Sequence, residues 1–136
     1  RVVLDGAHNP QKLAALRAAL GDGRLSVVLA ATGQRAPAAL LEGLASSAEH
    51  LYVCELDLYG KSVVPAVDLA EAATAAGVPS TVAQSPEDAL DSALDAAGPT
   101  GQVLVTGSLY LLGKLRNRWY PNEEVLLQQT SWPQHA

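Results

Sequence analysis

The stretch RVVLDGAHNP, residues 1–10, decides the fold, because an apolar β-branched run breaks there directly into a polar turn. Residues 1–5 predict a strand, and Pro10 suits the first position of a helix. Gly6 lets the backbone turn sharply or approach a ligand closely. A strand that leads into a helix in this way sets polar side chains beside backbone amides at a helix start, where a phosphorylated or nucleotide ligand is readily bound.

Outward from this stretch, apolar strand-like runs alternate with segments of helical periodicity. Ser85, followed by Pro86, predicts a capped helix start. Parallel neighbours in a sheet need helical crossovers, so the alternation predicts a doubly wound, Rossmann-like α/β fold with a mostly parallel sheet. We expect strands at residues 1–5, 26–31, 51–56, 81–83 and 102–106, and helices at residues 10–20, 37–48, 67–76, 86–97 and 108–119.

Four polar segments directly follow predicted strands, at residues 5–9, 32–35, 57–61 and 106–110. In a parallel sheet the carboxyl ends of the strands meet at one edge, and ligands bind there. We therefore expect these four segments to gather around one binding site.

The length and the composition of the chain limit which functions this site can have. The chain has 136 residues, enough for one domain, and its net charge of -5 argues against a nucleic-acid partner. Cys54 lies among apolar residues and is expected to be a buried thiol in a reducing cytoplasm rather than a reactive one. No apolar run reaches the roughly 18 residues of a membrane span. We expect a cytoplasmic monomer with no membrane partner.

The abrupt start at Arg1 indicates one domain, residues 1–136, of a longer polypeptide, with residues 121–136 as a tail.

The opening turn has two interpretations. Asn9 before Pro10 is a good helix N-cap, and a cap alone explains it. A cap does not require Asp5 or His8. A carboxylate can accept hydrogen bonds from ribose hydroxyls, and an imidazole can stack on a base or bond a phosphate. From the residues alone, a nucleotide site and a structural turn both remain open.

Two motifs carry a family resemblance. Residues 4–10, LDGAHNP, resemble the motif that opens the C-terminal domain of folylpolyglutamate synthases and dihydrofolate synthases, members of the Mur ligase superfamily. Residues 105–111, VTGSLYL, are similar to a segment near the C-terminus of the same proteins. Mur peptide ligases typically have Tyr where Gly6 stands, so the glycine favours the folate branch.

The resemblance implies an ATP-dependent amide ligase. In that family ATP phosphorylates a substrate carboxylate, and the amino group of glutamate attacks the resulting acyl phosphate. A central P-loop domain binds the triphosphate and most of the Mg²⁺. This sequence contains no G-x-x-x-x-G-K-[ST] loop. We therefore expect an N-terminal P-loop domain of the same polypeptide as the partner, and no ligase activity from this chain alone.

The resemblance also assigns roles to residues. Asp5 matches an aspartate that contacts the nucleotide through its ribose, and His8 matches a histidine placed against adenine or the incoming glutamate. Asn9 is placed with them at ATP. Ser108, with Tyr110 beside it, matches a serine that positions glutamate, although Ser108 also suits a helix N-cap. No residue of this chain is assigned to metal or to the chemical step itself.

Two loops depart from the family pattern. The segment 31–35 lacks the usual acids, and the segment 57–61 has only Lys61 where an arginine is common. Arg35 and Lys61 are therefore interpreted as solvated surface charges, as are the cations of the last helix. Two other functions stay open. One is a freestanding nucleotide-binding or regulatory α/β module without ligase chemistry. The other is a Mur-type peptide ligase domain acting on another carboxylate.

Overall fold

The computed structural model describes residues 2–4, 11, 14–15, 18, 25–33 and 36–119. Five strands form one sheet in the order β1-β5-β2-β3-β4, and every neighbouring pair is parallel. The strands are β1 (Val2–Leu4), β2 (Leu25–Leu29), β3 (Ala48–Val53), β4 (Ser80–Val82) and β5 (Val103–Thr106). The helices are α2 (Pro37–Glu42), α3 (Ala66–Ala75), α4 (Pro86–Ala97) and α5 (Leu109–Leu115), followed by the 3₁₀ turn η1 (Arg116–Arg118). The predicted α/β fold with a parallel sheet is confirmed.

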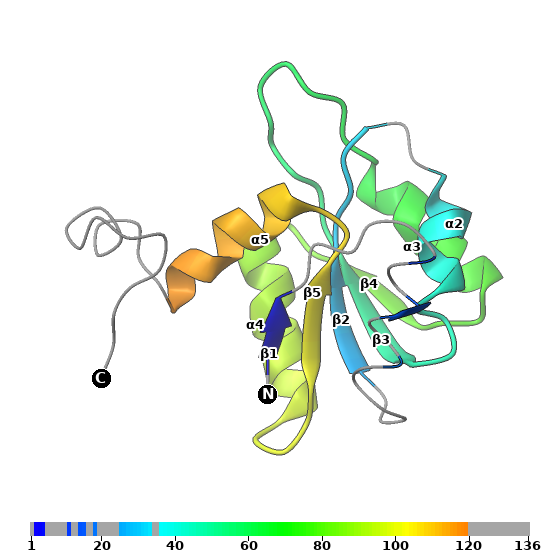
Figure 1. Ribbon diagram of the computed structural model, residues 1–136, viewed down its shortest axis with the longest axis vertical. Coiled ribbons are helices and arrows are strands. Elements are labelled where there is room, and N and C mark those ends of the chain that lie inside the picture. The colour runs from blue at the N-terminus through cyan, green and yellow to red at the C-terminus, as the bar shows by residue number, and fades with distance from the viewer. Residues whose placement is uncertain are drawn as a thin grey trace.

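Helices cover both faces of the sheet, with α2 and α3 on one face and α4 and α5 on the other (Figure 1). The central strand β2 directs apolar side chains to both faces of the sheet. Val27 and Leu29 face the α2 and α3 layer, whereas Val28 and Ala30 face the α4 and α5 layer. All four are fully buried, as expected for a strand with helices on both sides.

Helix α2 is shorter than its pattern predicts. The expected helix over residues 37–48 ends at Glu42, and residues 43–47 continue as turns. Ala48 pairs with Leu25 as the first residue of β3, so strand pairing overrides the helical periodicity there. The turns still bury Leu44, whose amide donates to the Leu41 carbonyl at 3.1 Å.

The remaining elements differ from prediction only at their ends. Ser85 accepts a hydrogen bond from the Asp88 amide at 3.1 Å, which confirms the predicted cap of α4. The last helix, expected over residues 108–119, ends at Leu115 and tightens into η1. The expected strand end at residue 5, most of the helix at 10–20, and the tail from 121 lie outside the described residues. No helix in the described ranges has the length and apolarity to cross a bilayer.

The carboxyl ends of β5 and β2 make an unusually close contact. Gly107 follows β5 with φ at +105°, and a Cβ atom on it would lie 2.2 Å from the carbonyl oxygen of Ala30. Only glycine permits both this backbone conformation and this approach. The contact sets the point from which α5 starts.

We expect the substitution Gly107→Ala to lower the free energy of unfolding by roughly 2–4 kcal/mol, because backbone strain and an overlap with a backbone oxygen add together. Gly113→Ala is the matched control. Gly113 lies inside α5, and a Cβ atom there meets no atom within 4 Å. Helix propensity then predicts a gain of about 0.5–1 kcal/mol. Urea unfolding measures both variants, and equal effects at the two positions would contradict the close contact.

Candidate functional site

A hollow of about 310 Å³ lies at the carboxyl edge of the sheet. It is lined by Thr32 and Gly33 after β2, by Lys61 and Ser62 in the loop between β3 and α3, and by Tyr110 in α5. Three of the four polar segments predicted to meet at this edge therefore contribute to one site. The fourth, residues 5–9, lies outside the described residues, and so do Asp5, His8, Asn9 and Arg35.

Backbone hydrogen bonds hold the two loops of the hollow together. The Gly33 amide donates to the Ser62 carbonyl at 2.8 Å, and the Val64 amide donates to the Ala31 carbonyl at 3.0 Å. Thr32 and Val63 form an isolated antiparallel bridge between them. The position of Lys61 and Ser62 is thus fixed against the end of β2.

Glu55 closes the base of the loop between β3 and α3. Its carboxylate Oε1 accepts a hydrogen bond from the Ala66 amide at 2.8 Å, at the first turn of α3. Pro65 precedes that helix and provides no side-chain cap. No local sequence pattern marks Glu55 as a functional residue. An uncapped Pro65–Ala66 helix start was a signal that a distant acceptor is needed.

Lys61, in the loop between β3 and α3, and Tyr110, in the first turn of α5, come together in space. The Lys61 ammonium lies over the Tyr110 ring, 5.3 Å from the ring centroid, a distance at which a cation is attracted to the face of an aromatic ring. Lys61 is exposed, as expected of a surface charge, but it also borders the hollow. No sequence pattern joins Lys61 with Tyr110, because 48 residues lie between them and only the fold brings the loop and the start of α5 together.

Ser108 is the N-cap of α5. Its Oγ accepts a hydrogen bond from the Tyr110 amide at 3.1 Å, and the residue is only 4% exposed. The cap interpretation is therefore confirmed. The role of Ser108 toward glutamate stays a prediction. Tyr110 itself is 46% exposed and lines the hollow.

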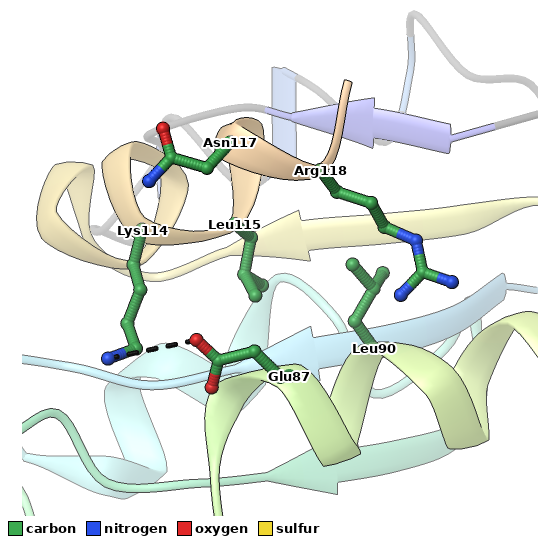
Figure 2. Close-up of a pocket in the computed structure, with 6 residues that line it drawn as sticks. All are labelled: Glu87, Leu90, Lys114, Leu115, Asn117 and Arg118. Carbon is green, nitrogen blue, oxygen red and sulfur yellow. Dashed lines mark ion pairs between the residues drawn. The ribbon is translucent and has the colours of Figure 1, made fainter. Parts of the chain in front are cut away.

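A second hollow, of about 400 Å³, lies between α4 and α5 (Figure 2). Its cations are already paired with acids. Lys114 Nζ lies 3.7 Å from Glu87 Oε1, and the Arg118 guanidinium contacts Asp91. These side chains are about half exposed, so each pair contributes only about 0–1 kcal/mol. Lys114 and Arg118 are the surface charges that the sequence predicted, and their charge is compensated locally.

The described residues offer no cluster of metal ligands and no exposed thiol at the carboxyl edge. In the part of the chain that the structure describes, no three side chains of the His, Cys, Asp or Glu type are grouped so as to hold a metal ion. His50 instead shares a 2.8 Å hydrogen bond with the Thr81 hydroxyl. Cys54 is fully buried, which confirms the prediction, and its Sγ lies 3.8 Å from the Leu29 carbonyl oxygen. Burial, with a smaller effect of the Glu87 carboxylate, raises the pKa of the Cys54 thiol to about 12.

Comparison with known proteins gives one consistent result. The family model described as Mur ligase, glutamate ligase domain, matches residues 1–109. No curated protein sequence matches the chain. Among solved structures, folylpolyglutamate synthase of Mycobacterium tuberculosis complexed with ADP and AMPPCP is 27% identical with a TM-score of 0.74, over 86% of this chain and 29% of that one.

Two further solved structures of the same kind of enzyme are similar to this chain. E. coli FolC in complex with ADP is 26% identical with a TM-score of 0.74, over 87% of this chain and 28% of that one. The bifunctional folylpolyglutamate synthase/dihydrofolate synthase of Yersinia pestis with Mn, AMPPNP and L-glutamate bound is 21% identical with a TM-score of 0.70. The match covers 86% of this chain and 28% of that one. The last likeness is one of fold alone. The chain spans less than a third of the length of each of these proteins.

The buried Cys54 thiol predicts a pH dependence of stability. The pKa of the thiol is about 12 in the folded chain against a usual value of 9.0, so the folded state holds the proton more tightly. The stability from this group is full below pH 9 and is lost between about pH 9 and about pH 12. In that window the free energy of unfolding should fall more steeply than in Cys54→Ala, by up to about 1.4 kcal/mol per pH unit. Parallel pH profiles of the two proteins in urea unfolding would contradict this assignment.

Proposed function

Because the chain belongs to the Mur ligase glutamate ligase domain family, we propose that it is the C-terminal domain of an ATP-dependent ligase that adds L-glutamate to folate or dihydropteroate. The observation that supports this most is the hollow at the carboxyl edge, which adjoins the VTGSLYL motif through Tyr110. Solved relatives at 26–27% identity are a folylpolyglutamate synthase and FolC, both with nucleotide bound.

The proposed reaction divides between two parts of the polypeptide. The upstream P-loop domain would hold the triphosphate and Mg²⁺ while ATP phosphorylates the carboxylate of the folate substrate. The glutamate amine then attacks the acyl carbon, an amide C–N bond forms, and phosphate leaves as the C–O bond breaks. This chain would contribute Asp5, His8 and Asn9 to the nucleotide. His8, Ser108 and Tyr110 would contribute to glutamate.

Lys61 joins the proposed glutamate contacts. The described residues that line the hollow include one cation, Lys61, and two hydroxyl-bearing neighbours, Thr32 and Ser62. The Tyr110 ring holds the Lys61 ammonium at the hollow without neutralising its charge. An ammonium available in this way can bind a substrate carboxylate through charge-assisted hydrogen bonds. Glutamate has two carboxylates that are not attacked in the reaction, and Lys61 can bind either of them.

The full-length protein tests the proposed function. With ATP, L-glutamate and a folate or dihydropteroate substrate, we expect ADP, phosphate and a glutamylated product by chromatography and mass spectrometry. The isolated chain of residues 1–136 should fold and form no product. Product with cell-wall precursors and none with folates would favour a Mur-type peptide ligase. Absence of any ATP-dependent product would favour a nucleotide-binding module, and glutamylation by the isolated chain would contradict the divided site.

The substitution Lys61→Met should raise the KM for L-glutamate by about 10-fold or more, since a hydrogen bond to a charged group contributes about 1.5–3 kcal/mol. The KM for ATP should not change. Lys114→Met is the matched control, because it removes the same charge from α5 at a pair with Glu87. Steady-state kinetics of the full-length variants measures the KM for L-glutamate and the KM for ATP. An equal change of both KM values, or the same effect from Lys114→Met, would contradict the role of Lys61.

A further inference from the structure

The hollow between α4 and α5 is larger than the one at the carboxyl edge, and the proposed function makes no use of it. Leu90 and Leu115 line this hollow, and both residues are almost fully buried. Figure 2 shows them between the side chains of Lys114 and Arg118. These two cationic side chains are about half exposed, and their hydrocarbon stems present apolar surface beside the leucines. The hollow therefore has an apolar floor with a cation on each side.

The ion pairs of the hollow leave both cations with hydrogen-bond donors for a further acceptor. Lys114 Nζ lies 3.7 Å from the Glu87 carboxylate, which is longer than a hydrogen bond, and an ammonium has three N–H donors. The Arg118 guanidinium contacts Asp91 through one terminal nitrogen and has five N–H donors. Among the described residues, Glu87 and Asp91 are the only acids paired with these two cations. A carboxylate that reaches the hollow can therefore be bound without breaking either pair.

The chain leaves the described part of the structure beside this hollow. Asn117 and Arg118 line the hollow, and Trp119 is the last described residue. Residues 120–136 follow. Two packed helices lie about 8–10 Å apart, and an extended chain spans at most about 3.6 Å per residue. A segment that begins at residue 120 is therefore long enough to fold back over the hollow within a few residues.

The sequence of that segment matches the two features of the hollow. Glu123 and Glu124 directly precede the apolar run 125–127, which reads VLL. Residues 120–136 contain no Lys or Arg, whereas residues 114–119 contain three cations and no acid. Three consecutive large apolar residues are unfavourable in water and need a surface that covers them. The acids thus suit the cations of the hollow, and the apolar run suits its floor.

We propose that residues 123–127 dock in the hollow between α4 and α5. Glu123 and Glu124 accept hydrogen bonds from Lys114 and Arg118, and Leu126 lies between the two cationic stems. The tether at residue 119 favours this occupant over a separate molecule, because a short flexible link gives an effective concentration on the order of millimolar. Docking covers the hollow and joins the end of α5 to α4. It needs no substrate and is therefore independent of the proposed ligase function.

Photo-crosslinking of the full-length protein identifies the occupant. Benzoylphenylalanine at position 126 should crosslink to the peptide of α4, residues 86–97, because α4 forms the far wall of the hollow. The same probe at position 134 is the matched control, and its yield at α4 should be at least 5-fold lower. Equal yields from the two positions would overturn the proposal. Crosslinks from position 126 to a second copy, or to residues upstream of residue 1 in place of α4, would overturn it as well.

Charge reversal tests the contact between the acids and the cations. Lys114→Glu should lower the yield of the α4 crosslink at least 3-fold, because it places a carboxylate where the acids of the segment bind. Glu123→Lys combined with Glu124→Lys should restore the yield in the Lys114→Glu protein and lower it in the protein with Lys114. A yield that these exchanges leave unchanged would contradict the proposed contact.

Urea unfolding measures the packing of the apolar run. Leu126→Asp should lower the equilibrium constant of folding by about 10-fold, because one leucine side chain loses its cover. Gln128→Asp is the matched control, since it adds the same charge just outside the docked residues. Its folding constant should stay unchanged. Equal effects of the two substitutions would overturn the docking of Leu126.

Discussion

Strands β2 and β5 run side by side through the sheet, and beyond their carboxyl ends Gly107 has no room for a Cβ atom beside the carbonyl oxygen of Ala30. This contact determines where the chain leaves the sheet after β5. Ser108 follows and caps α5, which brings the Tyr110 ring to the hollow. The polar site at the carboxyl edge therefore depends on a purely steric constraint.

The fold could be predicted from the sequence because its signal is local. Alternating apolar runs and helical periodicity predicted the parallel sheet, and Ser85 before Pro86 marked the start of α4. The errors occurred where a distant partner decides the local structure. Residues 43–48 carry helical spacing, but Ala48 pairs with Leu25, and the strand begins there.

The site was predicted only in outline, for the same physical reason. The rule that polar loops of a parallel sheet share one edge brought three segments together correctly. The contacts within that edge depend on loop conformation. The cation and ring contact of Lys61 with Tyr110 and the capping of Ala66 by Glu55 each join positions with no local pattern between them. Pocket size would not have identified the site either, since the hollow between α4 and α5 is larger and has its cations neutralised.

The hydrogen bond from the Ala66 amide to Glu55 has a consequence for how this domain can vary. The hydrogen bond joins the two ends of a ten-residue loop and holds them at the sheet and at α3. The loop is therefore already closed at its base. The entropic cost of lengthening a closed loop rises only slowly with its length. The residues at the loop tip, 59–61, lie outside the segment 62–64 that bonds to the end of β2, so they can be exchanged, shortened or extended while the sheet stays unchanged. The same fold could in this way carry different loop tips at this edge, and the different tips could bind different partners or substrates.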